Sequence, residues 1–174
     1  NVSVAKSRIA AEEMYKKIVD NRNVQEEDAK ETAQIVGLSA IKYGDLSNQA
    51  SKDYIFDVDR FTSFEGNTGP YILYTIVRIK SIMSRYAAEG NSLEDGKILP
   101  AVSDSEKALM LVLGKFGQMT ADAFAEKAPH KVCAYIYELA NEFNRFYHET
   151  KILSEENKTQ QQSWIRLLKL TKEV

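Results

Sequence analysis

The chain has 174 residues, of which 44% are hydrophobic and 28% are charged, with a formal net charge of −2 and a pI of about 5.8. This is the composition of a globular domain, and it excludes a bulk polycation, so any binding of nucleic acid has to rest on a local group of residues. No apolar run approaches the roughly 20 residues that cross a bilayer, and the single cysteine, Cys133, excludes an intrachain disulfide. We therefore expect a cytoplasmic protein without a membrane partner.

The amino-terminal part of the sequence predicts helices separated by polar segments. Residues 3–20 carry an apolar stripe at helical spacing, and the polar run of residues 21–27 is expected to end this helix. A second helix is predicted from about Asp28 to Gly37, because glycine commonly follows the last residue of a helix. Residues 38–43 then form a further apolar segment that we expect to be helical.

A loop followed by a helix start is the strongest local signal in the chain. Gly69 and Pro70 suit the cap and the first position of a helix, so we predict a helix from Pro70 to about residue 88. Upstream, acids alternate with aromatic and apolar residues, and an extended piece at 54–57 competes with a helix start at 57–62.

The remaining helices follow from caps, breaks and apolar spacing. Their expected bounds are residues 103–113 with Ser103 or Asp104 as the cap, Thr120 to Ala128 before a break at Pro129, 130–151, and Gln161 to the end of the chain. The prediction is an all-α fold, an antiparallel helical bundle preceded by a small helical subdomain.

Three residues at the start of the predicted helix 70–88 share one face. Tyr71, Tyr74 and Arg78 are spaced i, i+3 and i+7. Aromatic rings and guanidinium groups stack on the bases of single-stranded RNA, so this face suits RNA binding. From the residues alone, tyrosines packed at the margin of a core are the more common explanation. A free-standing helical module that binds a protein through the same face is a further alternative, since Tyr and Arg are enriched in protein interfaces.

Signals for catalysis or metal binding are weak. His130 and His148 lack metal-ligand spacing, and Asp57 with Asp59 is more typical of a helix cap and a surface charge than of an acid–base pair. The segment 66–69 lacks the Lys-Ser/Thr ending of a phosphate loop. We predict no catalytic residue, no cofactor site and no metal site in these residues.

Several motifs in order along the chain resemble the carboxy-terminal part of class I arginyl-tRNA synthetases. The segments that carry this resemblance are residues 40–47, 53–60, 63–71 with Tyr74 and Arg78-Ile79, Pro129, 135–140, 143–147 and Arg166-Leu167. The resemblance therefore covers nearly the whole chain.

This resemblance implies a division of labour within a longer enzyme. Residues 1–64 would be the helical tail of a catalytic module, and residues 65–174 an all-helical anticodon-binding domain. By match of motif, Tyr71, Tyr74 and Arg78 would bind tRNA(Arg), and Tyr147 would join them as a weaker inference. The parent enzyme would use ATP and Mg²⁺, would bind no DNA and would be monomeric. The family's His-x-Gly-His and Lys-Met-Ser-Lys signatures do not occur here, so we expect no aminoacylation by these residues alone.

Two further expectations concern the end of the chain and its cations. The chain starts without methionine and stops within an apolar pattern, which suggests a piece of a longer protein. We expect this to expose Trp164, Leu167 and Leu170 and to allow self-association through them. A local group of cations is expected to contribute to RNA affinity, namely Lys42, Arg78, Lys80 and Arg85.

Overall fold

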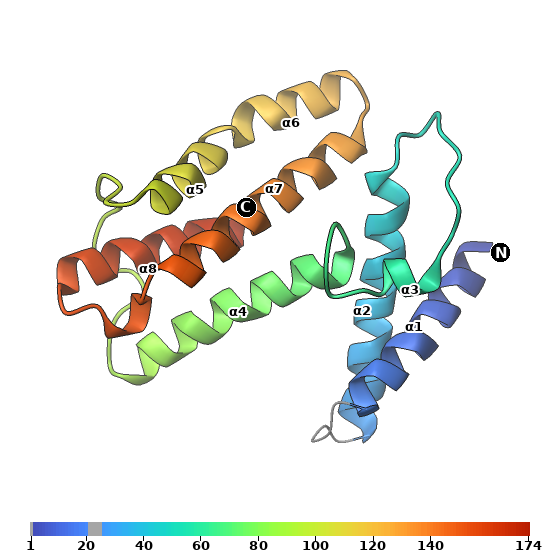
Figure 1. Cartoon of the computed structure of the whole chain (residues 1–174), viewed down its shortest axis with the longest axis horizontal. Coiled ribbons are helices and arrows are strands. Elements are labelled where there is room, and N and C mark those ends of the chain that lie inside the picture. The colour runs from blue at the N-terminus through green and yellow to red at the C-terminus, as the bar shows by residue number, and fades with distance from the viewer. Residues whose placement is uncertain (1, 21–25) are drawn as a thin grey trace. The chain divides into compact units, whose positions relative to one another are not determined.

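The computed structural model describes residues 2–20 and 26–174, and within these ranges it contains helices and no β-strand (Figure 1). The expected all-α fold class is confirmed. The polar break predicted after residue 20 lies largely outside the described ranges. The helices are α1 (Val2–Asp20), α2 (Glu26–Ser47), α3 (Val58–Phe61), α4 (Gly69–Ala88), α5 (Asp104–Gly114), α6 (Phe116–Ala125), α7 (Pro129–Glu149), the 3-10 turn η1 (Ile152–Ser154) and α8 (Lys158–Glu173).

Contacts within the chain define two compact units. The first comprises the described residues up to Tyr74 together with Ala123–Ala134, and the second comprises Thr75–Asp122 together with Tyr135–Val174. In the second unit, successive long helices alternate in direction (Figure 1). The division expected after residue 64 remains a prediction.

In the first unit, α1 and α2 form an antiparallel pair (Figure 1). Helix α2 continues through Gly37, so the prediction that this glycine ends a helix is wrong. A Cβ atom added at Gly37 would lie 2.7 Å from the backbone nitrogen of Ala11. The glycine is therefore explained by the close approach of the two helices and not by a helix end.

In the segment before α4, the structure contains the helix start that the sequence left open, and no strand is formed at 54–57. Residues 54–57 are not helical, and α3 begins directly after them at Val58. The side chain of Asp57 accepts a hydrogen bond from the Arg60 backbone N–H at 3.1 Å, which makes it the cap of α3. Phe61 at the end of α3 packs against the rings of Tyr54 and Phe56, with centroids 5.7 and 5.3 Å away.

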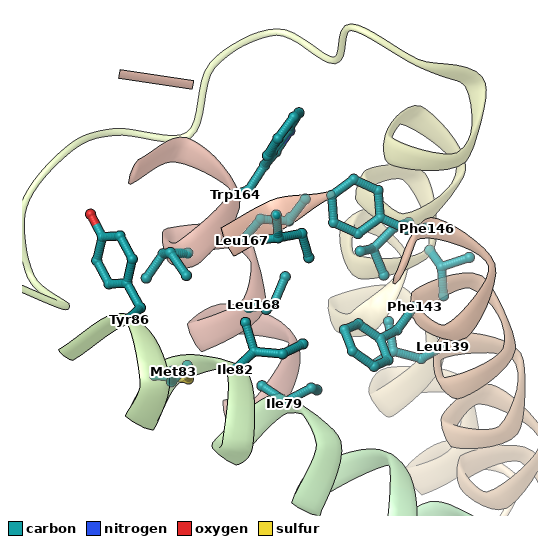
Figure 2. Close-up of a cluster of buried hydrophobic side chains, with 14 of the residues drawn as sticks. Ile79, Ile82, Met83, Tyr86, Leu139, Phe143, Phe146, Trp164, Leu167 and Leu168 are labelled. Carbon is teal, nitrogen blue, oxygen red and sulfur yellow. The ribbon is translucent and has the colours of Figure 1, made fainter. Parts of the chain in front are cut away.

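The second unit is built around large apolar side chains from α4, α5, α7 and α8. Figure 2 shows those of α4, α7 and α8 directed toward one another. Trp164 and Leu167 are only 6% and 1% exposed, whereas Leu170 is 39% exposed. The expected exposure is thus wrong for Trp164 and Leu167, because α4 and α7 already cover that face of α8. Self-association through this stripe remains a prediction, and of the three residues only Leu170 is exposed.

The first turns of α5 and α8 are capped by side chains. Ser103 accepts from the backbone N–H of Glu106 at 3.2 Å, and the Glu106 carboxylate accepts from the Val102 N–H at 2.9 Å. This arrangement is close to a capping box, with Glu106 bonding one residue further back than the capping residue. Asn157 caps α8 by accepting from the Gln160 N–H.

Two helix starts differ from the prediction. Helix α6 begins at Phe116, and Thr120 lies inside it with its hydroxyl donating to the Phe116 carbonyl at 3.0 Å. Helix α8 begins at Lys158, and Gln161 is buried with its amide donating to the carbonyl oxygens of Ile152 and Leu153. In both cases a polar residue that resembled a helix start bonds to the preceding turn. Among the described residues, no helix is both long and apolar enough to cross a membrane.

Candidate nucleic-acid interface

The start of α4 is fixed by hydrogen bonds and by a close helix contact within the first unit. The Thr68 hydroxyl accepts from the Tyr71 backbone N–H at 3.2 Å and donates to the Ser63 carbonyl at 2.6 Å. Thr68, and not Gly69, therefore acts as the cap. A Cβ atom on Gly69 would lie 2.5 Å from the Ser39 carbonyl oxygen in α2, so only glycine allows this approach.

A second tie holds the loop before α4. The Tyr43 hydroxyl of α2 donates to the Cys133 carbonyl at 2.8 Å and lies within hydrogen-bonding distance of the Asn67 side chain. Burial raises the pKa of the Cys133 thiol, because burial disfavours the charged thiolate. Within the first unit, α2, the loop and the first turns of α7 are thus connected at one tyrosine.

All three residues of the predicted face lie on α4. Tyr71 is half-buried, Tyr74 is 48% exposed, and Arg78 is half-buried. Because α4 is continuous from Gly69 to Ala88, their i, i+3 and i+7 spacing does place them on one side of the helix. Tyr74 is the most accessible of the three for stacking.

Arg78 and Tyr147 are brought together in the second unit. The guanidinium carbon of Arg78 lies 4.8 Å from the centroid of the Tyr147 ring, within the range of a cation–π contact. Tyr147 in turn stacks on Phe143, with centroids 6.2 Å apart and an angle of 24° between the rings. Tyr147, which the motif match implied only weakly, is therefore a direct partner of Arg78.

Asn144 holds the arginine in this position. Its side-chain oxygen accepts a hydrogen bond from Arg78 Nη1. Its Nδ2 donates to the Ala140 carbonyl at 2.9 Å and to the Thr75 hydroxyl at 3.1 Å. Since Asn144 is buried, these bonds orient both it and Arg78. Asn144 lies in the motif segment 143–147, but the sequence analysis assigned it no role, although an asparagine among the apolar positions of α7 was a usable signal.

The expected cations Lys42, Lys80 and Arg85 differ in where they lie relative to the Arg78 face of α4, and their role in RNA binding remains a prediction. Lys42 is exposed on α2, in the first unit. Lys80 is exposed on α4, but two residues correspond to about 200° of helical rotation from Arg78, so it lies away from that face. Arg85, seven residues after Arg78, lies on the same face and is exposed. Among the expected cations on α4, Arg78 and Arg85 share one face of the helix.

The histidines show no metal-binding arrangement in the part of the chain that the structure describes. Across residues 2–20 and 26–174, no group of three or more His, Cys, Asp or Glu side chains is placed to hold a metal ion. The ring of His148 packs edge-on to Tyr147, with centroids 5.5 Å apart. His148 is thus a neighbour of the aromatic and cationic site.

The comparison with family models gives the class of this helical domain. Residues 72–174 match the DALR anticodon binding domain, and the chain belongs to that family. Tyr74, Arg78 and Tyr147 lie inside the matched region, and Tyr71 directly precedes it.

The chain is also similar to arginine–tRNA ligases. It is 61% identical to that of Agathobacter rectalis over 94% of the chain and 29% of the relative, and 52% identical to that of Alkaliphilus oremlandii over 96% and 28%. Among solved structures, it superposes on Plasmodium falciparum arginyl-tRNA synthetase with a TM-score of 0.77 at 27% identity, covering 99% of this chain and 30% of that one. For the Thermus thermophilus enzyme the TM-score is 0.75 at 26% identity, and the superposition covers 98% of this chain and 29% of that one.

These relatives confirm the resemblance expected from the motifs. The chain spans less than a third of the length of each of these four proteins.

Proposed function

We propose that this chain is the tRNA-binding portion of an arginine–tRNA ligase, and that it holds the anticodon region of tRNA(Arg) during attachment of arginine. The observation that carries this proposal is the Arg78–Tyr147 contact, fixed by Asn144, in a DALR anticodon binding domain. ATP and Mg²⁺ would serve the ligase reaction, and no residue of this chain is assigned to them.

The geometry suits recognition of unpaired bases. Tyr74 offers an exposed ring on the first turns of α4, and each base stacked on an aromatic ring contributes about 1–3 kcal/mol. Arg78 lies against Tyr147 as a planar cation, and a guanidinium group can bond a phosphate or lie parallel to a base. Tyr71, half-buried at the base of this face, would support Tyr74 and contact the RNA at its edge.

The proposal includes the setting of the enzyme. We place the ligase in the cytoplasm as a monomer, with tRNA(Arg) as its nucleic-acid partner and no role for DNA or a membrane. The competing function, a free-standing protein-interaction module that uses the same Tyr and Arg face, predicts no affinity for tRNA(Arg).

Fluorescence anisotropy with labelled tRNA(Arg) tests the proposal. Tyr74→Ala and Tyr147→Ala should each weaken binding roughly 5-fold to 150-fold, the equivalent of one base stack. Tyr147→Phe keeps the ring and should bind like the wild type. Phe124→Ala is the matched control, because Phe124 is an aromatic residue that is 88% exposed on α6 and outside the proposed face.

Two results would contradict the proposal. The first is unchanged affinity in both alanine variants with unchanged circular dichroism. The second is an equal decrease in affinity for Phe124→Ala, which would mean that any exposed aromatic residue contributes. A chimera in which this chain replaces the matching segment of the Agathobacter rectalis ligase extends the test to activity, where Tyr74→Ala should raise KM for tRNA.

A further inference from the structure

An open groove lies beside Tyr147 in the second unit. It has a volume of about 590 Å³ and is lined by residues from the later turns of α4, the end of α7, and η1 with the segment before it. Its charged and polar lining includes Arg85, Glu89, His148 and Lys151. Apolar side chains, among them Ile82 and Ile152, complete the lining. The groove therefore combines cations with an apolar surface.

Within the part of the chain that the structure describes, no acidic side chain pairs with the two cations of the groove. Arg85 and Lys151 are exposed, and in the described ranges 2–20 and 26–174 neither side chain forms an ion pair. Several other cations of the same unit are paired: Lys115 with Glu138, Arg145 with Glu142 and Glu149, and Arg166 and Lys169 with Glu94. Lys107 on α5 is exposed and also forms no ion pair within the described ranges, but it does not line the groove. Arg85 and Lys151 are thus available to an anion from outside the chain.

The groove is continuous with the Arg78 site through one side chain. Tyr147 contacts the Arg78 guanidinium and also lines the groove. Arg85 follows Arg78 by seven residues on the same face of α4. A polyanion that places a base at Tyr147 would therefore meet Arg85 and Lys151 with its adjoining backbone. Proteins that bind single-stranded nucleic acid use this combination of stacking rings and a cationic groove.

We infer that this groove binds backbone phosphates of the same RNA whose bases stack near Arg78 and Tyr147, with Arg85 and Lys151 as the phosphate contacts. The inference rests on the proposed function. The aromatic wall and apolar lining favour RNA over an acidic peptide, because an acidic peptide offers no base to stack on Tyr147. The groove would thus supply sequence-independent affinity, while the α4 face contacts bases.

Salt dependence of binding tests the inference. The probe is the anticodon stem-loop RNA of tRNA(Arg), titrated at several salt concentrations with the wild type, Arg85→Gln, Lys151→Gln and the double variant. Removing one phosphate-binding cation should reduce the slope of log K against log salt by about 0.7 and weaken binding several-fold at low salt. Lys107→Gln is the matched control, since Lys107 is an exposed cation on α5 that does not line the groove.

The outcomes separate this inference from the proposed function. If Tyr147→Ala weakens RNA binding while the double variant keeps the wild-type slope, the groove assignment is overturned and the tRNA proposal stands. If the wild type itself does not bind the RNA, the proposed function fails. If polyglutamate binds the wild type as tightly as the RNA does and the double variant no longer binds it, the groove belongs to an acidic protein partner instead. All four lysine and arginine variants alter exposed side chains, and circular dichroism verifies their folding.

Discussion

Different kinds of side chain are packed inside the two units of the chain. In the second unit, aromatic and large aliphatic residues such as Phe143, Phe146 and Trp164 are buried together. In the first unit, α1 and α2 are in close contact where Ala10 and Ala33 are buried and Gly37 lies against α1. Large side chains bury more apolar area per residue, whereas small ones permit close helix contact. The stability of the second unit should therefore decrease most when side-chain atoms are removed. The stability of the α1–α2 pair should decrease most when side-chain atoms are added.

Among the described residues, exposed apolar side chains are more frequent on α1 and α2 than on α4, α7 and α8, although Val77 on α4 and Leu170 on α8 are also exposed. Ile9 on α1 and Ile35 and Leu38 on α2 are exposed. On α4, α7 and α8, most residues of similar size line the buried core. The apolar pattern of α1 and α2 therefore adds less to burial within the chain than their sequences suggest.

The largest expected effect comes from removing a core ring in the second unit. Phe146→Ala should lower the free energy of unfolding by about 3–5 kcal/mol, because Phe146 is fully buried and its removal leaves a cavity. Guanidinium titration followed by the fluorescence of Trp164 measures this, since the Trp164 ring lies 6.1 Å from that of Phe146. A decrease below about 1 kcal/mol would show that the core repacks, and the contrast between the units would weaken.

A smaller effect is expected from adding one methyl group in the first unit. Gly37→Ala should destabilise the α1–α2 pair by about 1–3 kcal/mol, because the new Cβ atom would overlap the backbone of Ala11. Gly117→Ala is the control, because a Cβ atom added at Gly117 in α6 would meet no neighbouring atom within 4 Å. This variant should be neutral or slightly stabilising. Thermal unfolding followed by circular dichroism compares the two. Equal unfolding temperatures of the two variants would contradict the close contact at Gly37.

The smallest perturbation uses the native thiol as a reporter of the first unit. Cys133 is buried and its pKa is raised, so little thiolate is present at neutral pH and the native protein should react slowly with a thiol reagent. The thiolate is the form that reacts, so the labelling rate of Cys133 should increase as the pH rises toward its raised pKa. Stopped-flow labelling with and without denaturant gives the two rates. Fast labelling of the native protein would indicate that this unit opens locally.

The long amphipathic helices could be predicted from sequence because their apolar spacing is regular over many turns. This holds for α4 and α7, whose predicted bounds differ from the observed ones by two residues or fewer. Gly37, Thr120 and Gln161 were misinterpreted because each has the local character of a helix end or start. Their actual roles depend on a neighbouring helix or on the preceding turn, which local spacing does not contain.

The site was predicted unevenly for a related reason. Helical spacing alone places Tyr71, Tyr74 and Arg78 on one face of α4. The pairing of Arg78 with Tyr147 joins residues that are 69 positions apart, as does the bond between Thr75 and Asn144. Such contacts depend on the packing of α4 against α7. Arg85 on α4 and Lys151, which follows the end of α7, line one groove only through the packing of these two helices.

The hydrogen bonds of Asn144 have a consequence for the thermodynamics of RNA binding. An arginine side chain free in solvent samples many rotamers, and fixing it on binding costs about 0.5–1.5 kcal/mol. Arg78 is already held by Asn144 and Tyr147 in the folded chain, so most of this entropy is lost during folding. Such preorganisation should lower the entropic cost of RNA association, and replacing Asn144 should make binding more enthalpically driven and less favourable in entropy.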